Sequence, residues 1–149
     1  MYQVMSRKYP NLMIYKSKSL SLESFYERIN LYNKKLQEEY GIPYFPAPNY
    51  NPIIFYENIR KGAIQKHEIW RYCLRYAIEA CSYELIDFCI SKGAQINMGL
   101  LWAVQKNISE SVDYLLLHYN FAMNDINLCL NHSDERDTLS LILYKLQNL

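Results

Sequence analysis

Apolar residues recur at steps of three and four along the chain from Leu22 to Tyr40, the spacing that places them on one face of an α-helix. Ser21 has the side chain of a helix N-cap, and Gly41 suits the left-handed residue that follows a helix end. The pattern therefore predicts a helix between these two residues.

Four prolines follow within 43–52, and each lacks a backbone N–H and favours extended geometry in the residue before it. We expect no helix to cross this segment. Its interleaved aromatic residues predict an extended connector that packs down. The last proline, Pro52, suits the first turn of a short helix that runs to about Lys61 and ends at Gly62.

An internal repeat occupies the rest of the chain. Segment 74–78 aligns with 100–104, and the same register shift places 86–90 over 112–116, so that alanine meets alanine and aspartate meets aspartate. Leu128-Cys129-Leu130 continues this register as a third, weaker copy. Segment 139–143 fits the third copy after a slip of one residue.

Each copy is typical of a helix, a short turn and a second helix. Such a unit cannot bury its apolar faces alone, so neighbouring units must stack. The predicted fold is all-α, with an N-terminal arm, helix and proline-rich connector over 1–66 and about three helix pairs over 67–149. First helices are expected at 69–80, 98–106 and 124–131, and second helices at 83–91, 109–118 and 135–147.

The joint between the first two units carries a family resemblance. Gly93-Ala94-Gln95-Ile96-Asn97 resembles the Gly-Ala-Asp-hydrophobic-Asn turn of ankyrin repeats, with Gln95 in place of the aspartate. Trp102-Ala103 falls near the small residue of that family's first helix. The Thr-Pro-Leu-His signature is absent, and the units are shorter than the roughly 33 residues of a full ankyrin repeat.

Units this short resemble the degenerate ankyrin repeats in the multigene-family proteins of African swine fever virus. The resemblance covers 69–120 and extends faintly over 121–149. Composition agrees with it, since Ile, Asn, Lys and Tyr, whose codons are A/T-rich, make up 53 of 149 residues. The resemblance implies a non-catalytic viral accessory protein in the host cytoplasm that binds a host signalling protein and antagonises interferon signalling.

The candidate partner-binding residues lie on the first helices. Arg71, Arg75 and Glu79 are four residues apart and share one stripe, which Glu68 joins a turn earlier. Such a stripe is also typical of a solvated face with a pair between Arg75 and Glu79. In ankyrin-type stacks the first helices line the concave surface. The resemblance therefore implies that this stripe, together with Leu101 and Gln105, faces a partner.

Neither the net charge nor the histidines and cysteines of the chain indicate a catalytic site. The net charge is +1, no apolar run is long enough to span a membrane, and no signal peptide is evident, which predicts an intracellular chain. We expect no metal site, no cofactor and no catalytic site, because the histidines are isolated, no glycine-rich loop occurs and the cysteines suit buried free thiols. These residues are His67, His118, His132, Cys73, Cys81, Cys89 and Cys129. The tryptophans Trp70 and Trp102 have apolar neighbours at helical spacing and are expected in the core.

Two alternatives to partner recognition remain. The basic arm, with Arg7, Lys8, Lys16 and Lys18 beside tyrosines, has the residue types that bind single-stranded nucleic acid, although four charges are few. A short stack also has two apolar ends to cover, so the chain could self-associate as a homodimer. Affinity that falls steeply with salt would favour nucleic acid, and a concentration-dependent dimer without a host partner would favour self-association.

Overall fold

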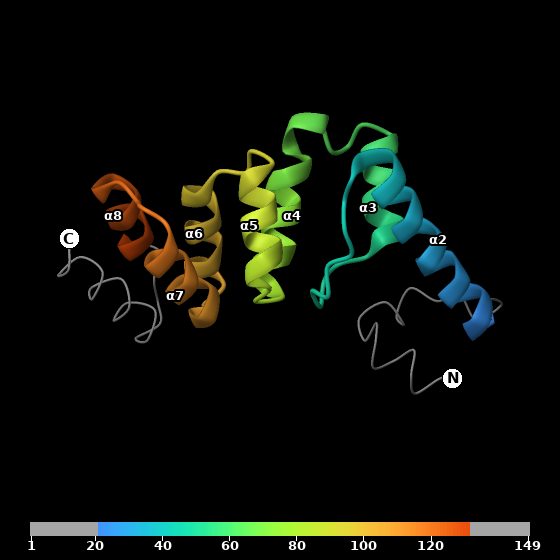
Figure 1. Ribbon diagram of the computed structural model, residues 1–149, viewed down its shortest axis with the longest axis horizontal. Helices are drawn as coiled ribbons and strands as arrows, with labels where there is room; N and C mark the ends of the chain where they lie inside the picture. The colour runs from blue at the N-terminus through green and yellow to red at the C-terminus, as the bar shows by residue number, and fades with distance from the viewer. Residues whose placement is uncertain (1–20, 132–149) are drawn as a thin grey trace. The chain divides into compact units, whose positions relative to one another are not determined.

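The computed structural model describes residues 21–131 (Figure 1). Within that range it contains seven α-helices, one short 3₁₀ helix and no β-strand, which confirms the predicted all-α class for the described chain. The predicted N-terminal arm and the predicted helix at 135–147 lie outside the described residues. The chain divides into two compact units, Met1–Ile69 and Trp70–Leu149.

The helices of the first unit begin and end where the sequence predicts. Helix α2 spans Leu22–Tyr40, and its N-cap Ser21 accepts a hydrogen bond from the Ser24 N–H at 3.1 Å. Gly41 ends α2 in the left-handed conformation, with φ of 69°. Helix α3 spans Pro52–Arg60 and is capped by the Asn51 side chain. A 3₁₀ turn, η2, follows over Lys66–Glu68.

The proline-rich connector between α2 and α3 packs down, as predicted. Phe45 and Tyr50 are buried, and their rings meet edge to face at 5.5 Å. Tyr50 in turn meets Phe55 of α3 at 5.9 Å. Because its aromatic residues are buried, the connector forms part of the core of this unit although it has no regular structure.

The second unit contains five helices, and each lies within two residues of its predicted bounds. They are α4 (Ile69–Glu79), α5 (Tyr83–Ser91), α6 (Ile96–Gln105), α7 (Ser109–His118) and α8 (Met123–Asn131). Helix α6 begins two residues earlier than expected, because the joint before it needs only Gly93, with φ of 107°, and the two residues that follow.

The sequence repeat is present in the backbone as well. Outside glycine, positive φ occurs in the described chain at Cys81 and Asn107, with values of 52° and 54°. In both turns the next residue donates its N–H to the carbonyl of the residue five positions earlier, over 3.1 and 2.9 Å. The α4–α5 and α6–α7 pairs are therefore two copies of one helix-turn-helix unit.

Equivalent positions of the helix-pair copies form one core. Side chains that are at most 2% exposed recur at the same place in each copy, on α4, α6 and α8 and on α5 and α7. The sets are Leu74, Leu100 and Ile126; Ala77, Ala103 and Cys129; Ile86 and Val112; Cys89 and Leu115. Helix α6 packs against both α7 and α8, so the third copy, α8, continues the stack in register.

Gly99 lies at a close contact between α4 and α6. A Cβ atom at this position would lie 2.9 Å from Leu74 Cδ2 and 3.2 Å from Ile78 Cδ1. The buried Ser111 of α7 links the two helix pairs further, because its hydroxyl donates a hydrogen bond to the Ile78 carbonyl of α4 over 2.7 Å. A glycine inside a helix lowers helix stability, and here it allows two first helices to approach closely.

We predict that Gly99→Leu lowers the free energy of unfolding by about 1–3 kcal/mol, because the new side chain would overpack the contact with Leu74. Gln105→Leu adds the same side chain at an exposed position of the same helix and should change stability by less than about 0.5 kcal/mol. Urea unfolding of both variants measures the difference. Equal stability of the two variants would contradict the close α4–α6 contact.

Candidate functional site

Five residues of α4 and α6, together with Lys106 directly after α6, form a continuous surface that we call the first-helix face. It consists of Arg71, Tyr72, Arg75, Met98, Trp102 and Lys106. Arg71, Met98 and Lys106 are exposed, and the other three are half-buried. The first helices of two successive copies are thus combined into one surface.

The cations of this face lie over its aromatic rings. The Arg75 guanidinium carbon is 4.5 Å from the centroid of the Trp102 ring and 5.6 Å from that of Tyr72. Lys106 Nζ is 4.8 Å from the Trp102 centroid, and the Arg71 guanidinium carbon is 5.8 Å from that of Tyr72. Contacts of this kind contribute about 0.5–1 kcal/mol each at exposed sites. They hold the charged groups of the face in place.

The prediction that both tryptophans are core residues is only partly correct. Trp70 is half-buried and packs edge to face on Phe88 at 5.5 Å. Trp102 is also half-buried, because it lies at the border between α4 and α6, where Arg75 and Lys106 cover its ring. The sequence repeat does not indicate this contact, because Arg75 and Trp102 are not equivalent positions of the two copies.

A shallow hollow lies between the two arginines and α6. Arg71, Leu74, Arg75, Met98 and Gly99 line it, and its cavity volume is about 10 Å³. A volume of about 10–15 Å³ holds a single water molecule. The hollow is therefore a dent in the surface and not a pocket for a ligand.

The structure places the predicted partner-binding residues in different environments. It brings Arg71 and Arg75 together on one side of the hollow. Gln105 is exposed and Leu101 is half-buried on α6, while Glu79 is half-buried at the last position of α4. Their role in binding stays a prediction.

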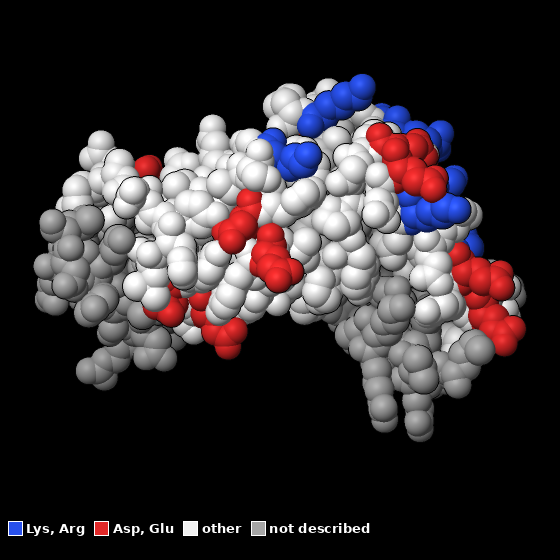
Figure 2. Space-filling view, in the orientation of Figure 1, with Lys and Arg blue, Asp and Glu red and all other residues white. Residues whose placement is uncertain are grey.

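The second helices of the repeat carry the opposite charge. Acidic side chains lie over α5 and α7 (Figure 2), and these two helices contain no Lys or Arg. The exposed carboxylates are Glu84, Asp87, Glu110 and Asp113. Helices α5 and α7 are therefore acidic, whereas α4 carries Arg71 and Arg75 and Lys106 directly follows α6.

Aromatic residues join the two second helices around one carboxylate. Asp87 of α5 accepts hydrogen bonds from the hydroxyls of Tyr114, over 2.6 Å, and Tyr119. The hydrogen bond to Asp87 is the main cause that raises the pKa of Tyr114 to about 12. Tyr83 stacks on Tyr114 with the ring centroids 4.3 Å apart. Both tyrosine hydroxyls are donors in this cluster, so it stabilises the α5–α7 contact.

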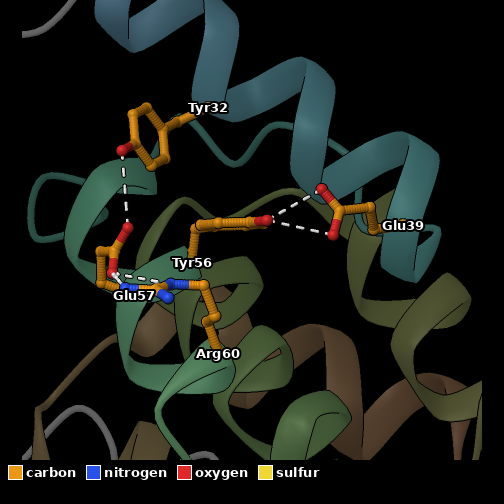
Figure 3. A network of polar contacts seen from close by, with 5 residues as sticks. All are labelled: Tyr32, Glu39, Tyr56, Glu57 and Arg60. Carbon is orange, nitrogen blue, oxygen red and sulfur yellow. Dashed lines mark hydrogen bonds and ion pairs between the residues drawn. The ribbon is translucent and has the colours of Figure 1, made fainter.

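A network of polar contacts joins α2 to α3 in the first unit (Figure 3). The Tyr56 hydroxyl donates to both oxygens of Glu39, over 2.9 and 3.0 Å, and this bond raises the pKa of Tyr56. Glu57 accepts from the Arg60 guanidinium at 2.7 Å and from the Tyr32 hydroxyl at 3.5 Å. Arg60 lowers the pKa of Glu57. Each carboxylate is held by a donor, which is the arrangement of a structural network.

The environment of the cysteines suits packed side chains and does not activate a thiol as a nucleophile. Cys73, Cys89 and Cys129 are buried free thiols, as predicted, and Cys81 is half-buried. Burial raises the pKa of Cys89 to about 12 and that of Cys129 to about 11. Nucleophilic cysteines need a lowered pKa, because the thiolate is the reactive form. These thiols are therefore protonated at neutral pH.

Among residues 21–131, no three histidine, cysteine or acidic side chains lie close enough to hold a metal ion. His67 and His118 are exposed, and His132 lies outside the described residues. None of the helices that the structure describes is long and apolar enough to cross a membrane.

No protein-family model, curated protein or solved structure matches this chain. The candidate site is therefore defined by its own geometry, namely cations that lie over aromatic rings on α4 and directly after α6.

We predict a difference in alkaline stability between the native chain and Tyr114→Phe. The pKa of Tyr114 is about 12 in the folded protein against an ordinary value of 10.0, so its hydrogen bond stabilises the fold fully below pH 10.0 and is lost as the pH rises through about 12. Between about pH 9 and 11 the native chain should lose more unfolding free energy than Tyr114→Phe. Urea titrations at both pH values measure this, and equal losses would contradict the bond to Asp87.

Proposed function

We propose that this chain is a non-catalytic protein-binding module and that the first-helix face is its binding surface. The observation that carries the proposal is the pair Arg71 and Arg75, which lie on α4 beside α6 and over the rings of Tyr72 and Trp102. Ring contacts with Tyr72 and Trp102 hold these cations. Arginine and aromatic residues are the types enriched in protein-binding hot spots.

The proposed architecture is a short stack of ankyrin-like units. Support comes from the helix-turn-helix unit that recurs along the chain and from the left-handed Gly93 at the joint between units. Stacks of this kind use an extended surface for recognition. A specific interface needs about 800 Å² per partner, which a face built from several helices can supply.

The proposed biological role follows from the sequence resemblance. A short member of the viral multigene-family proteins would act in the host cytoplasm on a component of innate immune signalling. Occupation of that component's own binding surface would be enough to block interferon signalling, because occlusion requires affinity and no chemical step.

The test is affinity purification of the tagged full chain from macrophage-type host cells, followed by mass spectrometry. A double variant, Arg71→Glu with Arg75→Glu, should lose a host signalling protein that the native chain retains, by about tenfold or more. The matched control is Lys61→Glu with Lys92→Glu. It makes the same change in charge at two exposed positions outside the face and should retain the partner.

Three results would contradict the proposal. Partners that both double variants lose would indicate a general effect of charge. Partners that nuclease removes would favour nucleic-acid binding, and recovery of the bait alone, with a concentration-dependent dimer, would favour self-association.

A further inference from the structure

We infer that the second helices of the repeat carry another binding surface, which takes a basic segment of a protein partner with an arginine side chain over the exposed ring of Tyr83. This surface lies on α5 and α7, so the inference goes beyond the function proposed for α4 and α6. We call it the second-helix face, and it consists of Tyr83, Glu84, Glu110, Asp113 and Tyr114. A stacked but exposed aromatic ring and carboxylates without a cation lead to the inference.

The Tyr83 ring is exposed and has no cation over it. One face of the ring stacks on Tyr114, with the centroids 4.3 Å apart and the ring planes 5° from parallel. Tyr83 is nevertheless 42% exposed, and among residues 21–131 no lysine or arginine lies over its ring. Trp102 differs, because Arg75 and Lys106 already contact its ring. Since cations are attracted to the faces of aromatic rings, Tyr83 suits a cation from a partner.

Carboxylates surround this ring in the register of the repeat. Glu84 and Asp87 of α5 recur as Glu110 and Asp113 of α7. Burial is the main cause that raises the pKa of Tyr83, and the negative charges of Glu110 and Asp113 raise it further, so both carboxylates lie near the Tyr83 hydroxyl. Stacking of the two helix pairs therefore brings the carboxylates of α7 to a tyrosine of α5.

Two of these carboxylates are open to a partner. In the part of the chain that the structure describes, the side chains of Glu84 and Asp113 form no ion pair and no hydrogen bond, and both residues are exposed. Helices α5 and α7 contain no Lys or Arg (Figure 2). The negative charge of the second-helix face is thus not neutralised within these helices, and a positively charged segment complements it.

Contacts between α5 and α7 hold the face in place before a partner binds. Asp87 accepts hydrogen bonds from the hydroxyls of Tyr114, over 2.6 Å, and Tyr119, so Asp87 serves the fold and not the partner. The His118 ring also contacts the Tyr114 ring, with the centroids 4.4 Å apart. Tyr114 in turn supports Tyr83 from one side. A ring that is already fixed loses less entropy when a partner binds.

Arginine in a protein segment fits this face better than other ligands. A guanidinium can lie flat on the Tyr83 ring and donate planar N–H groups to a carboxylate such as Glu84 or Asp113. The phosphates of a nucleic acid would be repelled by the same carboxylates. The net charge of the whole chain is +1, so a general attraction for basic peptides is absent and the local surface must bind them.

The experiment selects peptides on the immobilised full chain from a library of random dodecapeptides, in about 0.15 M NaCl so that long-range attraction is screened. We expect arginine to be enriched roughly threefold or more over the input, and above lysine, from one exposed cation–π contact and its carboxylate partner. Glu84→Gln with Asp113→Asn should abolish this enrichment. The matched control, Glu27→Gln with Glu38→Gln, removes the same charge at two exposed positions of α2 and should retain it.

A second pair of variants tests the ring separately from the charge. Tyr83→Phe keeps the aromatic face and should retain most of the enrichment. Tyr83→Leu keeps an apolar side chain without the ring and should retain less than about a third of it. Circular dichroism and thermal unfolding of each variant establish that it is folded before selection.

The inference is overturned if arginine is not enriched, if lysine or acidic residues are preferred, or if the two charge variants behave alike. Equal enrichment on Tyr83→Leu and Tyr83→Phe would overturn it as well. The variant Arg71→Glu with Arg75→Glu leaves the second-helix face unchanged and should retain the enrichment. A host protein that this variant loses, combined with no arginine enrichment on the native chain, would refute the inference and leave the proposed function standing.

Discussion

The close approach of α6 to α4 is the contact on which the repeat unit depends. Gly99 lies at this contact, where a Cβ atom would be 2.9 Å from Leu74 Cδ2, so that the Leu74 side chain would have to shift. The buried Ser111 hydroxyl then links α7 to the last turn of α4 through the Ile78 carbonyl. Once two first helices meet in this register, equivalent residues of the copies lie in one core. Each helix pair then covers the apolar face of the next pair.

The same register determines what the surface carries. Stacked first helices bring Arg75 next to Trp102, and stacked second helices bring Asp87 next to Tyr114. Arg71 and Arg75 of α4 and Lys106 after α6 therefore lie with aromatic rings, while α5 and α7 carry carboxylates and no Lys or Arg. The repeat thus produces a surface of defined charge without a deep pocket.

Local signals in the sequence predicted most of the helices in residues 21–131, because each depends on near neighbours. Ser21, Gly41 and Pro52 mark helix ends, and the repeat aligns the helix pairs. Contacts between distant residues were missed. The bond from Tyr56 to Glu39 and the place of Trp102 beneath Arg75 depend on how helices pack, which no local period encodes. The short turn η2 was also missed; there the Gln65 N–H donates to the Glu68 carboxylate at 3.2 Å.

Hydrogen–deuterium exchange of the native chain and Leu100→Ala tests most directly whether the units share one core. Leu100 is fully buried on α6, which packs on α7 and α8 and contacts α4 at Gly99. Removing this side chain should cost about 2–5 kcal/mol. The account predicts faster exchange in α4 and α8 as well as in α6 and α7. Faster exchange confined to α6 and α7 would show that each pair is stable by itself and would contradict a common core.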